Sequence, residues 1–577
     1  MAINPGVSVA ENTDWPSYGL NMSGQRHAEL QQINRDNIHQ LQLAWKVNTG
    51  VKATFQATPL IVNGVMFVSL PYNHVLALDA KTGKTLWQYV HARRSDWPMC
   101  CGPANRGLAV AHGKVFFGTV DARLIALDAK TGHMLWDINV AGNQVNTEQQ
   151  TELNQRDPNK VRKVTGGTGV GIAMAPVVYK NKVIIGITGV GYGLHIDNPR
   201  SDAPLGAVIG VTGRYGRPGF LAAYDVQDGR QLWQFDTIPA QGWEGGFTTQ
   251  TADGSHFNRD IVSEKAAMSL YPDAAGFGGG SAWSTPAIDE ASDTLYFGTG
   301  NPSPQMNDVS RPGDNLYTVS LVALNTETGQ YKWHYQQVPH DLWGYDLASP
   351  PVLFNYTKNG VVIPAVGQAS KTGWFYIHDR HSGAFLAKSQ AFVPQLNLFK
   401  QPSAEGTVVY PGILGGANWS PVSVDQQANR VFIAAMHSPI KYTVHETDVQ
   451  GSNRSMRYTA SEPTNDERWG LLSAIDFTTG KIAWQHKTKQ PLIGGVLTTS
   501  SGLLFCGEGD GTFNAFDSQT GQVLWHYQSS YGVNAPPVSY EVDGEQYVSV
   551  VSGGNSLFGF KQGDAILTFK LPARNVK

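Results

Sequence analysis

The stretch Ala77-Leu78-Asp79-Ala80-Lys81-Thr82-Gly83-Lys84-Thr85-Leu86-Trp87 is the first full copy of a phrase that returns along most of the chain. Its form is Ala-x-Asp-x-x-(Thr/Asp)-Gly-x-x-x-Trp. The remaining copies are 126–136, 223–233, 323–333 (with Asn325 in place of Asp), 474–484, 515–525, a degraded copy over 379–387 that ends in Ala387, and the strand end Leu43-Ala44-Trp45. The chain therefore contains eight related units.

Each copy has a mechanical interpretation. An apolar strand ends at Asp, whose side chain caps a tight turn, and Gly supplies the positive φ of that turn. The next strand carries Trp at a fixed offset. Flanking segments such as 64–70, 114–118 and 294–298 are rich in the β-branched and aromatic residues that strands favour. One four-stranded unit cannot bury both of its faces, so neighbouring units must pack face to face with the Trp between them.

We therefore predict an all-β fold, an eight-bladed β-propeller of four-stranded antiparallel blades with tryptophan docking motifs. The alternative is an all-β sandwich whose turns look alike by chance, which eight near-regular copies disfavour. The N-terminal copy retains only its last strand, so we expect strands from the C-terminus to complete it. The whole chain, 1–577, is expected to be one domain. The wider gaps between copies predict long inserted loops, at about 140–215, 237–280, 390–415 and 440–468.

Bulk composition excludes several classes of protein. Charged residues make up 15% of the chain and the net charge is −3, with no basic cluster, so nucleic acid is not an expected partner. No apolar run approaches the roughly 20 residues that span a bilayer. The N-terminus shows no signal peptide. Three cysteines are too few for a disulfide scaffold, and Cys506, in an apolar strand, is expected to be inert core.

Several motifs outside the repeat occur in a characteristic order, and their order and spacing together are more specific than any one of them. These motifs are Thr58-Pro59-Leu60, Cys100-Cys101, Asn105-Arg106-Gly107, Gly278-Gly279-Gly280-Ser281-Ala282-Trp283, Phe297-Gly298-Thr299-Gly300-Asn301-Pro302, His340-Asp341-Leu342-Trp343, Lys371-Thr372-Gly373 and Gly415-Gly416-Ala417-Asn418-Trp419. On these motifs the chain resembles, from Trp15 through Tyr547, the large subunit of pyrroloquinoline quinone (PQQ)-dependent alcohol and glucose dehydrogenases, which are quinoproteins with eight four-stranded blades.

The resemblance implies a site for PQQ, a flat quinone with three carboxylates that needs two plates and a cationic rim. A ring disulfide between Cys100 and Cys101 is implied as one plate and Trp283 as the other; two free thiols are the alternative for the cysteines, and core packing is the alternative for Trp283. The remaining implied cofactor residues are Arg106 and Lys371 on the quinone oxygens and carboxylates, Asn418 and Trp419 at the cofactor edge, and Gln56 at a rim position where Glu is common.

The resemblance also implies a calcium or lanthanide ion as Lewis acid and a carboxylate base, and here the sequence departs from it. Of the expected Glu, Asn and Asp ligands only Asn301 is present, because 186–193 contains no acid and Gly344 stands where the catalytic Asp is expected. Asp346, two residues further on, is the candidate replacement as metal ligand and base, and Asp341 is a second candidate base. Two acids of the inserted segment, Asp197 and Asp202, are further candidates for folding back into the site.

These departures leave three hypotheses open. The first is a PQQ-dependent dehydrogenase that oxidises an alcohol or sugar and passes electrons to a separate acceptor such as a cytochrome, in the periplasm or outside the cell. The second is a propeller that binds PQQ or another small molecule without catalysis. The third is a rebuilt hub that uses His340 or His378, with copper or zinc; surface turn positions are the alternative for both histidines.

Overall fold

The Asp-Gly turn of the repeated phrase joins the third and fourth strands of a sheet. In the first copy these are β5 (Val75–Asp79) and β6 (Thr85–Tyr89). The amide and hydroxyl of Thr82 donate to the Asp79 carboxylate at 2.8 and 2.7 Å, and Gly83 has φ +74°. The predicted chemistry of this turn is confirmed.

The computed structural model describes residues 13–92, 102–140, 163–166, 171–187, 194–197, 218–272, 274–303, 308–309, 311–448 and 455–573. Within these ranges, the same antiparallel meander of four sequential strands recurs along the chain. Its first four occurrences are β3 (Leu60–Val62), β4 (Val65–Ser69), β5 and β6; β7 (Ala109–Ala111), β8 (Lys114–Gly118), β9 (Arg123–Asp128) and β10 (Met134–Asn139); β12 (Val177–Tyr179), β13 (Lys182–Gly186), β15 (Phe220–Asp225) and β16 (Gln231–Asp236); and β17 (Ala287–Asp289), β18 (Thr294–Gly298), β19 (Ser320–Asn325) and β20 (Tyr331–Gln336).

The second half of the chain repeats the pattern, and short β1 (His27–Ala28) adds in parallel to one of its sheets. These sheets are β21 (Val352–Lys358), β22 (Val361–Ala369), β23 (Phe375–Asp379) and β24 (Phe385–Lys388); β26 (Ser423–Asp425), β27 (Arg430–His437), β30 (Trp469–Asp476) and β31 (Ile482–Thr488); β32 (Val496–Thr499), β33 (Leu503–Gly507), β34 (Thr512–Asp517) and β35 (Val523–Gln528); and β36 (Val538–Val542), β37 (Glu545–Ser552), β38 (Gly563–Lys570) and β2 (Gln42–Ala53).

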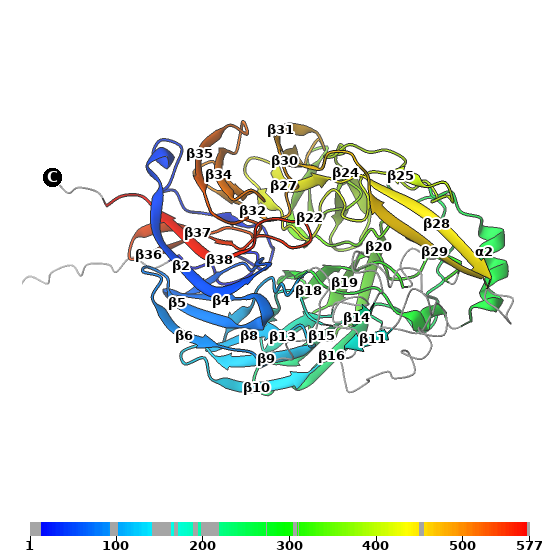
Figure 1. Cartoon of the computed structure of the whole chain (residues 1–577), viewed down its shortest axis with the longest axis horizontal. Helices are drawn as coiled ribbons and strands as arrows, with labels where there is room; N and C mark the ends of the chain where they lie inside the picture. The colour runs from blue at the N-terminus through cyan, green and yellow to red at the C-terminus, as the bar shows by residue number, and fades with distance from the viewer. Residues whose placement is uncertain are drawn as a thin grey trace, which may run out of the picture.

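The sheets follow one another around a common centre, and the last strands of the chain lie beside the first (Figure 1). The closing contact is the antiparallel pairing of β2 with β38, in which Trp45 lies opposite Thr568. The N-terminal strand thus completes the C-terminal sheet, as expected from the truncated first copy. The predicted all-β propeller of four-stranded antiparallel sheets is confirmed.

Tryptophans at the end of the phrase contact the turn of the next unit. Trp87 Nε1 donates to the carbonyl of Ala129 at 3.0 Å, and its indole lies so close to Gly132 that a Cβ there would come within 2.5 Å of the ring. Five other copies repeat this hydrogen bond; the donor and acceptor pairs are Trp136 to Val226, Trp233 to Thr326, Trp333 to Arg380, Trp484 to Ser518 and Trp525 to Leu41.

The degraded copy makes a different contact, because Ala387 has no indole. Gly480 of the following sheet instead faces the backbone of Lys388. Gln390 makes the hydrogen bonds to the following sheet instead. Its backbone amide donates to Gly480 O at 2.7 Å, and its side-chain oxygen Oε1 accepts from Ile482 N at 3.0 Å.

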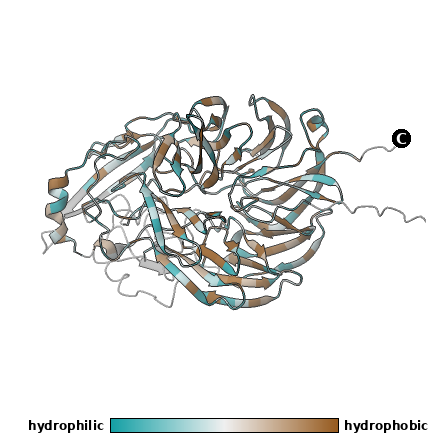
Figure 2. Cartoon of the chain, turned by 180° about the vertical axis from the view of Figure 1, so that it is seen from behind, coloured by the Kyte–Doolittle hydropathy of each residue, from teal (hydrophilic) through white to brown (hydrophobic). Residues whose placement is uncertain are grey.

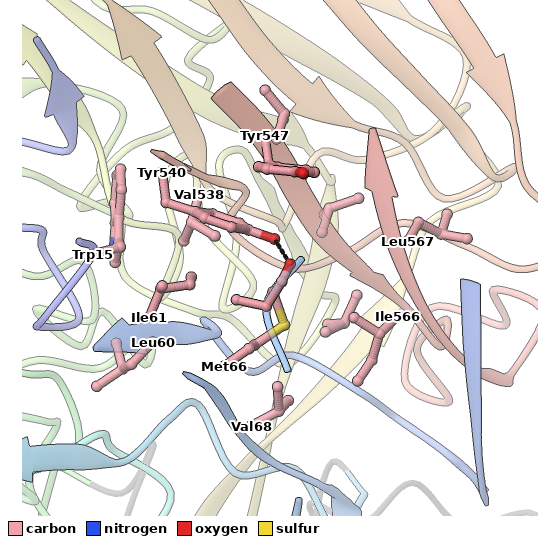
Figure 3. Packing of buried hydrophobic residues seen from close by; sticks show 14 of the residues in the cluster. Trp15, Leu60, Ile61, Met66, Val68, Val538, Tyr540, Tyr547, Ile566 and Leu567 are labelled. Atoms are coloured by element: carbon pink, nitrogen blue, oxygen red, sulfur yellow. Dashed lines mark hydrogen bonds between the residues drawn. The ribbon is translucent and has the colours of Figure 1, made fainter. Parts of the chain in front are cut away.

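The hydrophobic core is distributed between neighbouring sheets, and brown, apolar strand segments occur all round the ring in Figure 2. Figure 3 shows the junction of the first and last sheets, where side chains of β3 and β4 meet those of β36 to β38. Each of the labelled residues is at most 1% exposed: Trp15, Leu60, Ile61, Met66, Val68, Val538, Tyr540, Tyr547, Ile566 and Leu567. Burial of this kind stabilises the fold by roughly 25 cal/mol per Å² of apolar surface.

The remaining described elements lie in the connections between these strands. The helix α2 (Ile261–Ala267) and the strands β28 (Ile440–Asp448) and β29 (Ser455–Pro463) lie together at one end of the molecule (Figure 1). Among the described residues, no helix has the length and apolar composition required to cross a bilayer. The other elements are β25 (Thr407–Val409), which pairs with β28, the pair β11 (Lys163–Gly166) and β14 (Leu194–Asp197), and the 3-10 turns η1 (Ile38–Gln40), η2 (Pro71–Asn73), η4 (Met268–Leu270) and η5 (Ala274–Phe277).

Candidate active site

Most predicted cofactor residues lie in segments that lead into the first strand of a sheet. Arg106 precedes β7, Trp283 precedes β17 and Trp419 precedes β26. The fourth strands, such as β6, β10 and β16, lie at the periphery (Figure 1), so the first strands lie toward the centre of the ring. Residues far apart in the sequence therefore converge at one place.

The guanidinium of Arg106 lies over two indole rings at this place. Its guanidinium carbon lies 4.9 Å from the ring centroid of Trp283 and 5.0 Å from that of Trp419. The backbone of Arg106 is fixed by neighbouring segments, since its amide donates to Ala173 O and its carbonyl accepts from Thr58 N, both at 3.0 Å. A guanidinium close to aromatic faces is a stable cation–π arrangement, so the structure brings together a cation and two flat plates.

The three glycines before Trp283 allow the close backbone approach expected of them. All three have positive φ, between +67° and +99°. Gly280 N donates to Asn301 O at 2.9 Å, and a Cβ on Gly279 would lie 2.6 Å from the backbone nitrogen of Ser303. These contacts place the Trp283 segment beside Asn301.

Asp346 and Lys371 form a largely buried ion pair next to Asn301. The Lys371 ammonium lies 2.7 Å from Asp346 Oδ2 and donates to Gly344 O at 3.0 Å. The other carboxylate oxygen, Oδ1, accepts from Asn301 N at 2.8 Å. The side chains of Lys371 and Asp346 are 5% and 13% exposed. Asn301, Asp346 and Lys371, which come from three separate motifs, are thus brought together.

Asp341 occupies a different place in the same loop. Its carboxylate accepts backbone hydrogen bonds from Trp343, Gly344 and Tyr345 at 3.0 to 3.1 Å. It is 1% exposed, and burial is the main cause that raises its pKa to about 6. Its carboxylate therefore shapes the 343–345 turn that precedes Asp346.

The amide side chains near the centre differ in whether their polar atoms have hydrogen-bond partners. Asn418 is engaged within its own turn, since Nδ2 donates to Leu414 O at 2.9 Å and Oδ1 accepts from Trp419 N at 2.8 Å. By contrast, Oε1 of Gln56 and Nδ2 of Asn301 are buried and have no hydrogen-bond partner within the described part of the chain. Buried polar atoms are normally hydrogen-bonded in folded proteins, so these two atoms could bind the polar groups of a ligand.

Some candidates cannot be placed. Cys100, Cys101 and Asp202 lie outside the described residues, as does the side chain of Asp197. Cys506 is placed, and it is a free thiol that is 2% exposed, with its pKa raised by burial. The expectation of an inert core cysteine agrees with this position.

The two histidines of the third hypothesis are not surface residues, so that expectation was wrong. His340 is 4% exposed and its Nδ1 donates to Gly313 O at 2.7 Å. His378 is fully buried on β23, where its ring lies 4.3 Å from that of Tyr335. Burial lowers the pKa of each, to about 3 and about 4. Aromatic neighbours surround His378 and polar groups surround His340, and a turn-like sequence reveals neither environment.

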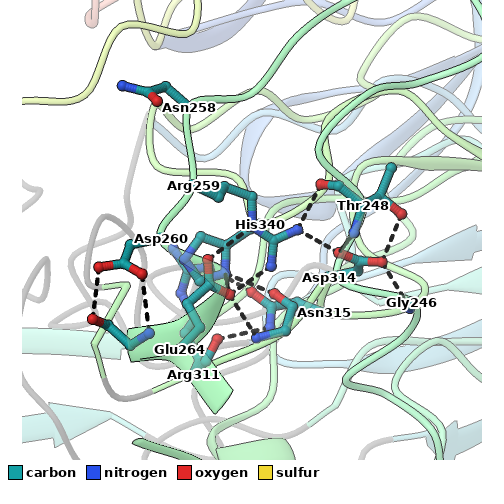
Figure 4. Close-up of polar contacts among 12 residues, drawn as sticks. Gly246, Thr248, Asn258, Arg259, Asp260, Glu264, Arg311, Asp314, Asn315 and His340 are labelled. Carbon is teal, nitrogen blue, oxygen red and sulfur yellow. Dashed lines mark hydrogen bonds and ion pairs between the residues drawn. The ribbon is translucent and has the colours of Figure 1, made fainter. Parts of the chain in front are cut away.

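His340 belongs to a buried polar network that the sequence did not predict (Figure 4). Arg259 forms ion pairs with Glu264, at 2.6 Å, and with Asp314. Arg311 is fully buried and donates to the carbonyl of Asp341. The network joins the inserted segment that contains α2 to the loop that carries Asp341. No local pattern pairs residue 259 with residue 314, so only tertiary structure reveals it.

Stability should depend on pH through His340. Its pKa is lowered in the folded state, first by burial and then by Arg311 and Arg259, while the unfolded chain binds a proton below about pH 6.5. Stability is therefore lost as pH falls from about 6.5 toward 3. We expect His340→Gln, which keeps a donor for Gly313 O, to flatten the dependence of the denaturation midpoint on pH over this range. An unchanged slope would assign the acid sensitivity to other groups.

The described residues fit PQQ. Arg106 and Lys371 supply cations for carboxylate and quinone oxygens, the two indoles supply flat apolar surface, and Gln56 and Asn301 supply unsatisfied polar atoms. When bound, this quinone would accept a hydride.

The same residues do not fit a calcium or lanthanide ion. Hard cations take six or more oxygen ligands, several of them anionic. Here Asn301 and the single carboxylate of Asp346 are adjacent, but that carboxylate is already bound by an ammonium and a backbone amide. No cluster of three or more His, Cys, Asp or Glu side chains suited to a metal occurs among the residues that the structure describes.

Comparison with known proteins reveals the family of this chain. The family model described as "PQQ: Glucose/ethanol/alcohol dehydrogenase, beta-propeller domain" matches residues 15–397 and 386–548. The chain is 33% identical to the quinoprotein alcohol dehydrogenase PedH of Pseudomonas putida, over 96% of this chain and 90% of that protein. It is 32% identical to a quinohemoprotein alcohol dehydrogenase of Comamonas testosteroni, over 96% of this chain and 74% of that protein.

Solved structures show the same likeness. The crystal structure of the Comamonas testosteroni quinohemoprotein alcohol dehydrogenase superposes with a TM-score of 0.78 at 31% identity, covering 97% of this chain and 80% of the other. A europium-containing methanol dehydrogenase superposes with a TM-score of 0.77 at 26% identity, covering 97% and 98%. The chain therefore belongs to the family of PQQ-dependent quinoprotein alcohol dehydrogenases, which are oxidoreductases.

Proposed function

We propose that this protein binds PQQ at the centre of the propeller and oxidises an alcohol. The observation that carries the proposal is the position of Arg106 over the rings of Trp283 and Trp419, with the Lys371–Asp346 pair in the same hub. Three segments distant in the sequence thus bring a cation and two flat rings together. Such a site suits a flat polyanion better than it suits an uncharged ligand.

Each residue has an assigned role in this proposal. Arg106 and Lys371 bind the carboxylates and quinone oxygens, and Trp283 and Trp419 supply flat surface. Gln56 and Asn418 contact the cofactor edge. The ring disulfide of Cys100 and Cys101, which the family resemblance implies, supplies a further plate.

Asp346 is assigned as the base. With PQQ bound, its carboxylate would take the hydroxyl proton of the alcohol, and the quinone would supply the hydride acceptor for oxidation of the alcohol to a carbonyl compound. Asp341 is assigned to position the turn before Asp346, because both of its oxygens accept backbone amides of that turn.

The wider setting follows the relatives. The substrate is a primary or secondary alcohol or a sugar, and the electrons pass to an external acceptor such as a cytochrome; a quinohemoprotein among the relatives supports that acceptor. The compartment is the periplasm or the cell exterior. The resemblance implies a calcium or lanthanide ion with Asn301 and Asp346 as ligands, and a europium-containing methanol dehydrogenase is among the similar structures, but the Asp346 carboxylate is already bound by Lys371 and the Asn301 amide.

We further propose that the eight meanders are the blades of one ring, docked by the tryptophan contacts, and that 1–577 is a single domain with the inserted loops expected from the sequence. The hydrogen bonds from six tryptophans to the next unit support this proposal. The pairing of β2 with β38 supports a closed ring.

If the tryptophans dock neighbouring blades, alanine substitutions at two glycines of one sheet should destabilise the protein by different amounts. Gly132 has φ +75° and lies against the Trp87 indole, whereas Gly113 has φ +70° and nothing within 4 Å of an added Cβ. An alanine costs about 1–2 kcal/mol at either position through its left-handed backbone. Gly132→Ala should lose about 1–3 kcal/mol more, because it displaces the indole. Denaturation midpoints measure the difference, and equal losses would contradict the docking role.

Enzymatic activity is tested by adding PQQ to the purified protein, with calcium, a lanthanide or a chelator present in separate samples. Quenching of tryptophan fluorescence reports binding beside Trp283 and Trp419, and reduction of an artificial dye in the presence of alcohols and sugars reports turnover. Binding with turnover supports the proposal. Stoichiometric PQQ without turnover over a broad panel would instead indicate a quinone-binding propeller. A protein that binds no PQQ but carries copper or zinc would indicate a rebuilt hub.

A further inference from the structure

The Lys371 ammonium lies where a hard cation would have to bind Asp346. It contacts Asp346 Oδ2 at 2.7 Å, while Asn301 N donates to Oδ1 at 2.8 Å, so both oxygens of this carboxylate are occupied. Asn301 is neutral, and the charges of Lys371 and Asp346 cancel. A calcium or lanthanide ion at this carboxylate would face a site with no net negative charge and a neighbouring ammonium.

The position of the ammonium is fixed by packing. A Cβ on Gly415 would lie 2.4 Å from Lys371 Cγ, so the backbone at Gly415 presses against the lysine stem. The Lys371 backbone carbonyl accepts from Gly416 N at 2.8 Å. The ammonium makes its second hydrogen bond to Gly344 O, the residue that stands where a second carboxylate is expected. Lys371 is 4% exposed, so little solvent screens its charge.

The carboxylate is confined on its other side as well. A Cβ on Gly300 would lie 2.9 Å from Asp346 Oδ1. The backbone at residues 300–301 therefore closes over that oxygen, and little space remains for the shell of six to eight oxygens that calcium requires.

We infer that this protein works without a bound hard cation, and that the Lys371 ammonium supplies the positive charge beside the quinone. This inference rests on the proposed function. The redox balance is unchanged: the alcohol gives a hydride to PQQ and its hydroxyl proton to a carboxylate, and PQQ is the oxidant. A fixed ammonium in a site of low exposure stabilises developing negative charge on an oxygen by the same electrostatic principle as a metal ion.

Metal-depleted protein provides the main test. We dialyse the protein against a chelator, load it with PQQ, and measure metal content, PQQ affinity by tryptophan quenching, and dye reduction. We expect less than one-tenth of a metal ion per chain at full PQQ loading, and affinity and turnover within about twofold of samples given calcium or lanthanum. Stoichiometric metal, or turnover only after calcium or lanthanum is restored, overturns the inference while leaving the proposed function intact. Failure to bind PQQ under every condition contradicts the proposed function itself.

Substitution of the lysine tests its role directly. Lys371→Met keeps the length of the stem and removes the charge, and we expect turnover to fall about 100-fold, as for the loss of one preorganised electrostatic donor. Lys388→Met is the matched control, because Lys388 pairs with Asp253 at 2.8 Å outside the site and should leave turnover unchanged. Equal turnover of the Lys371→Met variant and the native protein, at equal PQQ content, contradicts the inference.

Terbium luminescence provides a readout that needs no activity. We expect no tryptophan-sensitised terbium signal from the Asp346 site of the native protein, so Asp346→Asn should leave the luminescence unchanged. The double variant Gly344→Asp with Lys371→Met supplies two carboxylates and removes the ammonium. This variant should bind terbium at one ion per chain. Gly344 has φ +80°, a conformation that Asp tolerates better than most residues. A native signal that Asp346→Asn, Asp197→Asn or Asp202→Asn removes reveals a resident cation site and overturns the inference.

Discussion

Asp346→Asn is expected to lower kcat by about 10²–10⁴-fold, which is the usual contribution of a positioned general base. The substitution keeps an oxygen for the amide of Asn301 and removes the charge that would take the hydroxyl proton of the alcohol. PQQ content should remain at one per chain, because the cationic and aromatic contacts of Arg106 are untouched. Dye reduction at saturating alcohol, normalised to bound PQQ, measures the effect.

The matched control for this prediction is Asp253→Asn. Asp253 also pairs with a lysine, Lys388, at 2.8 Å, and its side chain is fully buried. The control should lose stability but retain kcat. Asp341→Asn is measured in parallel, since Asp341 is the second candidate base. If Asp346→Asn leaves kcat unchanged and Asp341→Asn lowers it strongly, Asp341 is the general base and Asp346 is not.

Arg259→Met is expected to cause the largest loss of stability, about 3–5 kcal/mol, because it leaves the carboxylates of Asp314 and Glu264 without their cation. The Arg259 and Asp314 side chains are 2% and 3% exposed, so water cannot replace the missing charge. Backbone amides of Gly246 and Thr248 still donate to Asp314, at 2.9 and 2.7 Å, which favours the lower end of this range (Figure 4). The shift of the denaturation midpoint measures the loss.

Arg230→Met is the matched control for the buried network. The guanidinium nitrogen Nη2 of Arg230 lies 4.0 Å from Asp225 Oδ2, and the Arg230 side chain is 66% exposed. A pair of this kind contributes at most about 1 kcal/mol. Equal effects of the two substitutions would show that the network of Arg259 adds nothing beyond an ordinary surface pair.

The repeated phrase allowed the sheet architecture to be predicted because its physics is local. Asp79, Thr82 and Gly83 form one turn from six consecutive residues, and the same turn recurs in each full copy. Even the degraded copy was placed correctly, since Gly383 has φ +77° and still lies against the Trp333 indole. Insertions could be recognised only as gaps between copies. The contacts that they make could not be predicted, because Arg259 and its partner Asp314 are 55 residues apart.

The candidate site likewise has features that the sequence could predict and features that it could not. Sequence motifs led to the prediction that Arg106, Trp283, Lys371 and Asn301 are cofactor or metal residues, because each stands in a motif that carries the family resemblance. They could not show that the carboxylate of Asp346 is occupied by Lys371, since 25 residues separate the two. Nor could they show that His378 is buried, because the turn that follows it appears exposed in sequence.

The sequence by itself determined that this protein is a propeller of Asp-Gly-Trp units with the motifs of a quinoprotein. Turn geometry and strand propensity act over a few residues, and the spacing of the copies requires face-to-face packing. Only the tertiary structure decided what the centre holds: a guanidinium over two indoles, and one carboxylate bound by an ammonium and an amide. Charge pairing and burial depend on which distant segments meet, and ring closure through β2 and β38 brings those segments together.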